Sequence, residues 1–193
     1  IFKNKFFLMK DKPIKNIIEQ GYCIGCGSCS VLDTNISINK NNIGLLQAKL
    51  KEGVDHYNDN SSDVCPFGST EDEDTIARSL YANNANYDKS VGYYEHIYSG
   101  YRLDKHRVDS SSGGLTNWLL VKLLEIGEID GVIHVGESSI DNSLFEYCIS
   151  STPEEIQNNS KSRYYPVHFD KVLNQIKLTN KKYAFVGVPC HIK

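Results

Sequence analysis

Three cysteines within seven residues near the start of the chain constrain the possible fold more than any other feature. They form a C-x2-C-x2-C run, and a fourth cysteine followed by proline stands far downstream; the four are Cys23, Cys26, Cys29 and Cys65. Iron-sulfur proteins use such a run, because three thiolates on one tight loop can each bind one iron of a cubane cluster. Gly25 and Gly27 permit the positive φ angles that wrap backbone around it. The spacing predicts one 4Fe-4S cluster on these four cysteines.

Zinc is the structural alternative for the same side chains, because four cysteines also make a closed tetrahedral zinc site. Zinc knuckles normally pair two separated C-x2-4-C hairpins. Here three cysteines share one loop, whereas Cys65 stands alone. The spacing therefore favours the cluster and leaves zinc open.

The long interval before Cys65 requires the intervening segment to fold back toward the other cysteines. Residues 36–39 alternate apolar and polar side chains, two asparagines at 41–42 offer a turn, and an apolar stretch resumes at 45–46. Such alternation on both sides of a turn predicts a β-hairpin. The hairpin would return the chain to the cluster.

Two domains of mixed α+β and α/β class are predicted on either side of a polar, breaker-rich stretch at 81–87. The first, over 9–82, is a small ferredoxin-like iron-sulfur domain. We interpret Met9, the only methionine, as its natural start. It would end in a short helix capped by Thr70. The second domain, over 90–193, is α/β, and we interpret the chain as truncated at its C-terminal end.

Charge and hydropathy exclude several classes of partner. The formal net charge is −3 and lysines and arginines are not clustered, so the basic stripe that binds nucleic acid is missing. The longest apolar runs are far shorter than the ~18 residues of a membrane-spanning helix, and no export signal is recognisable. Six cysteines without such a signal indicate metal binding in a reducing compartment. We therefore expect a cytoplasmic protein.

Strands and helices alternate in the second half, which is typical of an α/β architecture. We expect strands over 96–101, 131–135, 145–150 and 183–188, and helices over 115–126 and 169–178. Thr152, Pro153 and Glu155 predict a further helix that starts with a capping box. Cys148 falls within a strand pattern and is interpreted as a small core residue.

Two loops of this half are candidate ligand sites. The first, Ser111-Ser112-Gly113-Gly114, precedes the helix over 115–126, and the free N–H groups of a helix N-terminus attract an anion such as a flavin pyrophosphate. Helix capping alone would also explain its serines. The second loop, Gly187 to Pro189 and Cys190, follows a strand, and ligands gather at the carboxyl ends of strands in open α/β sheets.

A series of motifs, in this order, resembles the coenzyme F-420 hydrogenase/dehydrogenase beta-subunit family. The motifs are C-I-G-C-G-S-C, C-P-F, Y-S-G-Y-R, S-S-S-G-G-L, E-I-D-G-V-I, S-R-Y-Y-P and Y-A-F-V-G-V-P-C. Most of them are weak individually, but together they extend nearly from end to end. The Asn-, Lys- and Ile-rich composition favours the bacterial members that resemble polysaccharide-biosynthesis reductases.

The resemblance implies an iron-sulfur flavoprotein that passes electrons between the cluster and FAD. A redox partner, either ferredoxin or another subunit, or a small-molecule acceptor such as coenzyme F-420 would complete the transfer. By motif, the flavin and substrate pocket would be lined by 111–114, by Arg163 with Tyr164, and by 187–190. An arginine there could bind a phosphate or stabilise a reduced flavin. We also expect an oligomer.

This sequence departs from the family pattern at Lys161, where members usually have glycine before Ser-Arg-Tyr. Members also continue beyond the Val-Pro-Cys motif with further cysteines, so Cys190 is interpreted either as a ligand of a second cluster or as a neighbour of the flavin. Two other hypotheses stay open: a zinc-stabilised binding module without redox activity, and an inactive fragment of a longer enzyme.

Overall fold

The computed structural model describes residues 14–68, 71–139 and 143–193. The chain forms two compact units. The first contains 14–68 together with 168–171, and the second contains the other described residues. The ranges predicted from sequence, 9–82 and 90–193, differ from these units in two ways. Residues 71–82 belong to the second unit, and the short segment 168–171 belongs to the first.

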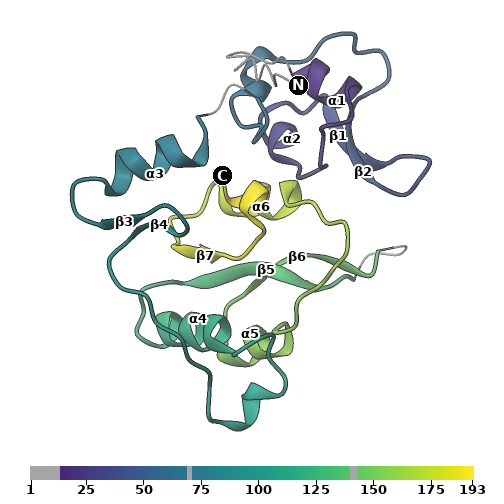
Figure 1. The fold of residues 1–193 in the computed structure, drawn as a ribbon. Coiled ribbons are helices and arrows are strands. Elements are labelled where there is room, and N and C mark those ends of the chain that lie inside the picture. Colours follow the sequence, from purple (N-terminus) through teal and green to yellow (C-terminus); the bar gives the residue numbers. More distant parts are fainter. Residues whose placement is uncertain (1–13, 69–70, 140–142) are drawn as a thin grey trace. The chain divides into compact units, whose positions relative to one another are not determined.

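The first unit combines short helices with one β-hairpin (Figure 1). Its elements are α1 (Ile14–Glu19), α2 (Ser28–Leu32), β1 (Ile36–Lys40), β2 (Leu46–Leu50) and a 3-10 helix at Asp59–Ser62. The strands pair antiparallel, with Ile36 opposite Leu50 and Lys40 opposite Leu46, which confirms the predicted hairpin. At its turn the Asn41 side chain accepts hydrogen bonds from the backbone N–H groups of residues 43 and 45.

The core of the first unit lies between α1 and the hairpin. Apolar residues one helical turn apart in α1 become buried there, because they lie on one face of the helix. The buried members are Ile14, Ile18, Cys29, Ile36 and Ala48. A cysteine of the predicted cluster run is therefore part of the core.

The second unit is built on a three-stranded sheet of order β6-β5-β7. Its elements are α3 (Glu73–Tyr81), β3 (Asn86–Asp88), β4 (Gly92–Tyr94), a 3-10 helix at Lys105–Arg107, α4 (Leu115–Glu125), β5 (Gly131–Glu137), β6 (Phe145–Ser150), α5 (Pro153–Asn158), β7 (Tyr183–Phe185) and α7 (Pro189–Ile192). Helix α6 (Asp170–Ile176) begins in the first unit and continues into the second. The central strand β5 pairs antiparallel with β6 and parallel with β7. Strands β3 and β4 form a separate hairpin.

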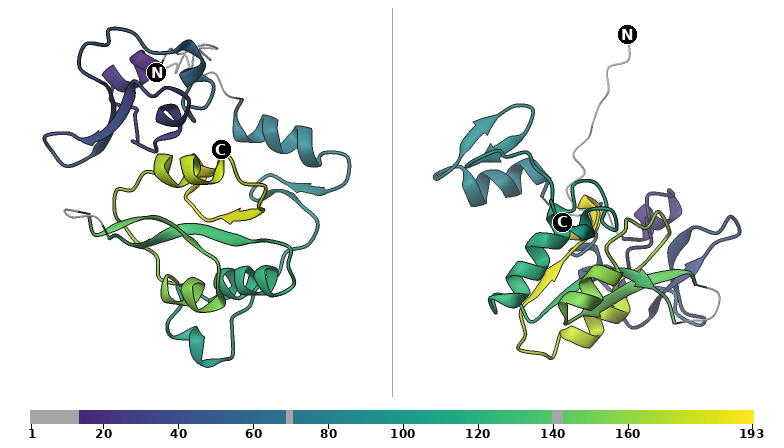
Figure 2. Two further views of the ribbon diagram at one scale, coloured as in Figure 1. Left: turned by 180° about the vertical axis from the view of Figure 1, so that it is seen from behind. Right: turned by 90° about the horizontal axis from the view of Figure 1, so that it is seen from below.

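Helices cover both faces of this sheet (Figures 1 and 2). On one face Val132 of β5 packs with Leu120 of α4 and Ile156 of α5. Because side chains alternate along a strand, Tyr147 of β6 lies on the opposite face, where its ring is 5.2 Å from that of Phe185. The core of the unit is therefore the layer between the sheet and the helices α4 and α5.

Several predicted elements are confirmed. The helix over 115–126 is α4, and Gly127 follows it with a φ of 75°. Strands β5 and β6 cover the predicted ranges 131–135 and 145–150. Thr152 and Glu155 form the expected capping box, with proline at the first helical position. The expected helix over 169–178 is the shorter α6.

Other predicted elements are wrong. Residues 96–101 form no strand, and Tyr98 and Tyr101 are exposed, because an alternating pattern needs a partner strand to pair with. The strand expected over 183–188 ends at Phe185, and Pro189 begins α7. The stretch 81–87 is not a plain linker, since it contains the end of α3 and the start of β3.

Two expectations fall on residues that the structure does not describe. The cap at Thr70 and the start at Met9 both lie outside the described residues. Helix α3 is instead capped by Asp72, whose carboxylate accepts a hydrogen bond from the Thr75 N–H at 2.7 Å. No helix within the described ranges has the length and hydrophobicity needed to cross a membrane. The ferredoxin-like and flavin-binding character of the two domains stays a prediction.

Candidate functional site

The loop of the first three cysteines is shaped by two glycines. Gly25 has a φ of 65° and Gly27 a φ of 97°, in the left-handed region that favours glycine, which confirms the prediction. A Cβ on Gly25 would stand 2.4 Å from the Leu46 Cβ. The loop can therefore approach strand β2 only because residue 25 has no side chain.

Cys65 reaches the same place through a series of polar contacts. The buried Asp33 carboxylate accepts hydrogen bonds from the backbone N–H groups of Asn35 and Asn58, at 2.9 and 3.0 Å. The Ser62 hydroxyl accepts another from the Ile14 N–H at 2.9 Å. These contacts fix the segment after the hairpin against α1 and α2. They explain how a cysteine far along the chain returns to the loop.

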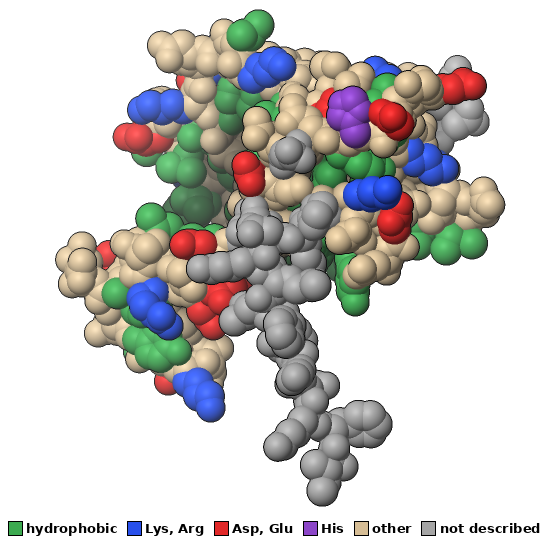
Figure 3. Space-filling view, turned by 90° about the horizontal axis from the view of Figure 1, so that it is seen from above, with side chains coloured by type: hydrophobic (Ala, Val, Ile, Leu, Met, Phe, Trp, Pro, Cys, Tyr) green, Lys and Arg blue, Asp and Glu red, His purple; other side chains and the backbone are tan. Residues whose placement is uncertain are grey.

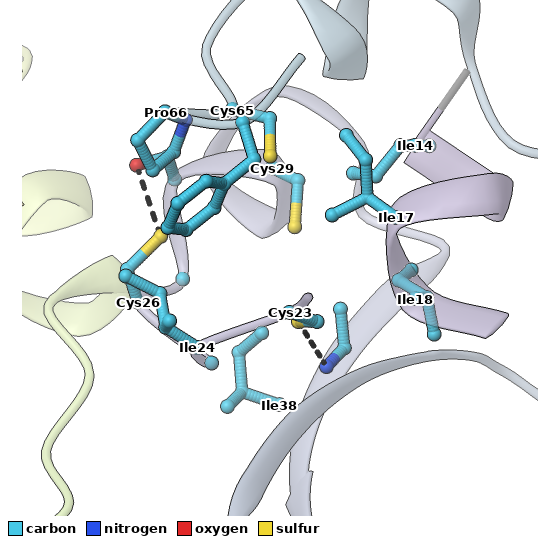
Figure 4. Close-up of a pocket in the computed structure, with 15 residues that line it drawn as sticks. Ile14, Ile17, Ile18, Cys23, Ile24, Cys26, Cys29, Ile38, Cys65 and Pro66 are labelled. Carbon is cyan, nitrogen blue, oxygen red and sulfur yellow. Dashed lines mark hydrogen bonds between the residues drawn. The ribbon is translucent and has the colours of Figure 1, made fainter. Parts of the chain in front are cut away.

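All four cysteines of the predicted set line one cavity (Figure 4). In the close-up, the sulfur atoms of Cys26, Cys29 and Cys65 point toward the same space. Isoleucine side chains from α1 and β1 close the other sides, together with the residues next to Cys65; they are Ile14, Ile17, Ile18, Ile38, Pro66 and Phe67. The structure thus surrounds a small apolar space with thiol groups.

The environment of these thiols opposes free negative charge. Burial, reinforced by the neighbouring cysteines, raises the pKa of Cys29 to about 12. Burial also raises the pKa of Cys65. The backbone N–H of Ala48 donates a hydrogen bond to the Cys23 sulfur at 3.4 Å. Four thiolates would be stable here only beside a positive centre, since a coordinating metal deprotonates a thiol.

The grouping of donor atoms bears on the kind of metal. Across residues 14–68, 71–139 and 143–193, no three His, Cys, Asp or Glu side chains are grouped so that they could hold a single metal ion. The four predicted cysteines nevertheless line the same cavity.

The segment 168–171 completes the cysteine site, and sequence reasoning missed it. The Phe169 N–H donates to the Cys26 carbonyl at 2.9 Å, and its side chain is buried. Asp170 lies beside Gly27 and is paired with His168. Burial raises the pKa of Asp170, but hydrogen bonds from His168, the Lys171 backbone and Ser30 outweigh burial, so this pKa is below its ordinary value. The apolar pattern of residues 169–178 predicts a helix, but it does not indicate that the start of the helix contacts the cysteine loop.

The Ser/Gly loop lies at the N-terminus of α4, as predicted. Gly114 is the N-cap residue and has a φ of 75°, and no side chain caps the helix. A Cβ on Gly113 would lie 2.8 Å from the Gly100 carbonyl oxygen. Ser111 accepts hydrogen bonds from the Ser162 N–H and hydroxyl, at 2.7 and 3.0 Å. The loop 111–114 is therefore joined to the loop that carries Arg163.

Three cations lie near this loop, and the side chain of one of them, Arg107, binds its backbone. Arg107 donates to the Ser112 carbonyl at 2.5 Å, and Lys161 donates to the Val108 carbonyl at 2.7 Å. Arg102 is paired with Asp104 and also donates to Gln157. The loop thus combines uncapped helix N–H groups with positive side chains.

Two buried amide groups flank the same loop without hydrogen-bond partners. They are the Asn117 Nδ2, in the first turn of α4, and the Gln157 Nε2, near the end of α5. Asn117 is only 9% exposed. Buried donors are nearly always paired, so an unpaired one marks a position for a ligand or water. Sequence reasoning missed both residues, because nothing in their local pattern indicates burial.

The other predicted flavin residues have different surroundings. The Arg163 guanidinium lies 5.1 Å from the centre of the Phe145 ring, and Tyr164 is almost fully exposed. Gly187 lies close to Tyr147, whose hydroxyl is 2.9 Å from His191 Nδ1. Cys190 lies in α7, next to this pair. The contacts of 187–190 are thus with β6 and α7, whereas those of 111–114 are with 100–102, Arg107 and Ser162.

The charged side chains on the face drawn in Figure 3 are mixed, with lysines and arginines lying among acidic residues. They do not gather there into the continuous basic stripe that a phosphate backbone requires.

Part of the second unit is similar to a known protein family. Residues 97–174 match the sequence model described as coenzyme F420 hydrogenase/dehydrogenase, beta subunit N-term. The matched segment contains the Ser/Gly loop, α4, β5, β6 and α5. In this segment the chain is similar to the coenzyme F420 hydrogenase/dehydrogenase beta-subunit family, as the resemblance predicted.

Two similar proteins come from Methanocaldococcus jannaschii. One is a coenzyme F420-dependent sulfite reductase, 25% identical over 185 residues, which are 95% of this chain and 26% of the reductase. The other is an uncharacterized protein, 33% identical over 88 residues, which are 46% of this chain and 33% of that protein. The chain thus matches about a quarter and a third of the lengths of these relatives.

Proposed function

We propose that this chain is the electron-transfer part of an oxidoreductase, with a 4Fe-4S cluster in the first unit and FAD in the second. The observation that carries the proposal is the single apolar cavity lined by all four predicted cysteines. The similarity of residues 97–174 to the F420 hydrogenase/dehydrogenase beta-subunit model supports it, as does the similarity to a protein named as an F420-dependent reductase. Electrons would pass to a redox partner protein, or to a small molecule such as coenzyme F420.

The donor set fits a cluster better than a single zinc ion. A zinc ion binds each thiolate at about 2.3 Å, so its four sulfurs converge on one point. Zinc sites also normally pair two separated C-x2-4-C hairpins, whereas three of the present cysteines share one loop. In a cubane cluster each cysteine binds a different iron, so the sulfurs stand around a larger space. The C-x2-C-x2-C spacing favours this second geometry, and the four cysteines that line one cavity are compatible with it.

The residues around the cavity have separable roles. When bound, the cluster would supply a one-electron store whose potential depends on charge, hydrogen bonds and solvent exposure. The Ala48 N–H would stabilise electron density on the Cys23 sulfur. The isoleucines of α1 and the ring of Phe67 would keep water away from the sulfurs. Each role follows from a contact within the first unit.

The second unit offers groups that fit the phosphates of FAD. The N-terminus of α4 carries N–H groups without a side-chain cap, which favours an anion. Arg107 adds positive charge on the backbone of the same loop, and Lys161 adds it at the nearby Val108 carbonyl. The unpaired Asn117 amide supplies a further donor. FAD bound there would supply the exchange between two-electron and one-electron chemistry.

Serine substitution of single cysteines tests the cluster assignment. Cys65→Ser replaces a thiolate with a hydroxyl, a poor iron ligand, so we expect the variant to lose most of its iron and acid-labile sulfide after anaerobic reconstitution. Cys148→Ser is the matched control, because Cys148 lies on β6, outside the cavity, and should retain wild-type content. Equal iron in both variants would refute the assignment, and zinc without sulfide would favour the zinc-stabilised module.

A further inference from the structure

The contacts of residues 168–171 cover the turn between Cys26 and Ser30. Phe169 is 3% exposed, and its N–H donates to the Cys26 carbonyl at 2.9 Å. The turn begins at Cys26 and contains Cys29, and both cysteines are proposed ligands. A backbone hydrogen bond at that point fixes the turn that carries them.

Asp170 places a carboxylate beside the same turn. A Cβ on Gly27 would stand 3.1 Å from both the backbone N and the Cβ of Asp170. The Asp170 carboxylate is paired with His168 and interacts with Ser30. Its side chain is only 20% exposed. A negative charge is therefore held in partial burial, in contact with residues on both sides of Cys29.

A simpler role for this acid would be to stabilise the N-terminus of α6, where Asp170 is the first residue. Acids are favoured in the first turn of a helix because they complement the helix dipole. That role explains the residue type, but it does not require the close approach to Gly27. It also does not require the buried contact of Phe169 with Cys26. These two contacts connect the segment specifically to the cysteine loop.

A carboxylate in this position affects the energy of an electron on the cluster. Reduction adds negative charge, and a nearby negative charge disfavours it, most strongly where water is excluded. Cluster potentials are accordingly sensitive to net charge and to the hydrogen bonds around the sulfurs. The effect requires a charge held in place, which the contacts of Asp170 provide.

We infer that residues 168–171 are part of the cluster site, and that Asp170 is a positioning residue that keeps the reduction potential of the cluster low. The inference rests on the proposed function, since it assigns the potential of that same cluster. It adds a component from far along the chain to a site otherwise formed by residues 14–67. The chain continues from this component through α6 into the second unit.

The test uses the full chain after anaerobic reconstitution, with two readouts. Iron and sulfide per chain report whether the cluster forms, and a potentiometric titration followed by electron paramagnetic resonance gives its midpoint potential. The main variant is Asp170→Asn, which keeps the shape of the side chain and removes its charge. The matched control is Asp55→Asn, because Asp55 is also paired with a histidine in the first unit but is 96% exposed.

We expect Asp170→Asn to bind wild-type amounts of iron with a midpoint potential shifted to more positive values, and Asp55→Asn to show no shift. Full iron with an unshifted potential in Asp170→Asn, or an equal shift in both variants, would overturn the inference. If Asp170→Asn binds less iron, the iron content of Asp170→Glu, which keeps the negative charge, becomes the deciding measurement. Iron restored by the retained charge supports the inference, and no restoration overturns it. A wild-type chain that binds neither iron nor sulfide would instead refute the proposed function itself.

Discussion

Single residues set the shape of the cysteine loop, and Gly27 has the most demanding position. It needs a left-handed backbone, and its missing Cβ leaves room for Asp170 at 3.1 Å. Either requirement alone would favour glycine. Because both requirements apply at Gly27, we expect a side chain at this position to disturb the contact between the loop and residues 168–171.

Substitution of Gly27 separates backbone strain from this contact. Gly53 has a similar φ of 81° with open space around it, so Gly53→Ala should cost only the left-handed strain of about 1 to 2 kcal/mol. Gly27→Ala should cost more and should lower the iron bound per chain, because segment 168–171 must move. Urea unfolding and iron analysis check both variants. Equal losses of stability with full iron in each would show that the contact has no role.

Asn117 provides a second residue-scale prediction. Its Nδ2 is buried without a partner, which costs about 1 to 3 kcal/mol in a protein without ligand. Asn117→Leu should therefore stabilise the flavin-free chain and weaken FAD binding about tenfold or more, since a hydrogen bond to a charged group is lost. Urea unfolding and flavin titration measure the two effects. An unchanged FAD affinity would show that the Asn117 amide does not contact the flavin.

At the scale of elements, β5 and β6 form the sheet that carries the second unit, and they enclose a titratable pair. His134 of β5 lies 2.7 Å from the Ser150 hydroxyl of β6, and both are buried. Burial, assisted by the positive charge of Arg163, lowers the pKa of His134 to about 4. The imidazole is therefore neutral in the folded chain at neutral pH.

This shift predicts how the second unit responds to acid. The unfolded chain binds a proton at His134 below about pH 6.5, whereas the folded chain binds it only near pH 4. The free energy of unfolding should therefore fall by about 2 to 3 kcal/mol between pH 7 and pH 4.5 through this residue. His134→Gln, which has no charge to gain, should lack that part of the loss. Fluorescence of Trp118, the single tryptophan, reports the unfolding; identical pH slopes would contradict the assignment.

Local patterns predicted the elements whose causes are local. The apolar stripe of α4, the capping box at Thr152 and the buried runs of β5 and β6 all depend on neighbours in sequence. The strand expected over 96–101 is wrong because its pattern finds no pairing partner. The end of β7 was misplaced because Pro189 begins a helix there. Whether residues 96–101 pair with another strand, and where β7 ends, depends on tertiary structure and not on the local sequence.

At the scale of the whole molecule, the spacing of the cysteines predicted a shared site, and the structure brings the four together. The hairpin between Cys29 and Cys65 was also predictable, because alternation and turn residues are local. The contribution of 168–171 was not, since these residues lie in a segment whose pattern indicates only a helix. The unpaired amides of Asn117 and Gln157 were equally hidden, because burial of a polar side chain leaves no periodic signal.

The central claim is that the four cysteines hold a 4Fe-4S cluster, and metal analysis of the full chain tests it most directly. The chain should be purified without oxygen, and iron, acid-labile sulfide and zinc should be measured per chain. We expect about four irons and about four sulfides, with broad absorption at about 400 nm, and no stoichiometric zinc. About one zinc per chain without sulfide would contradict it.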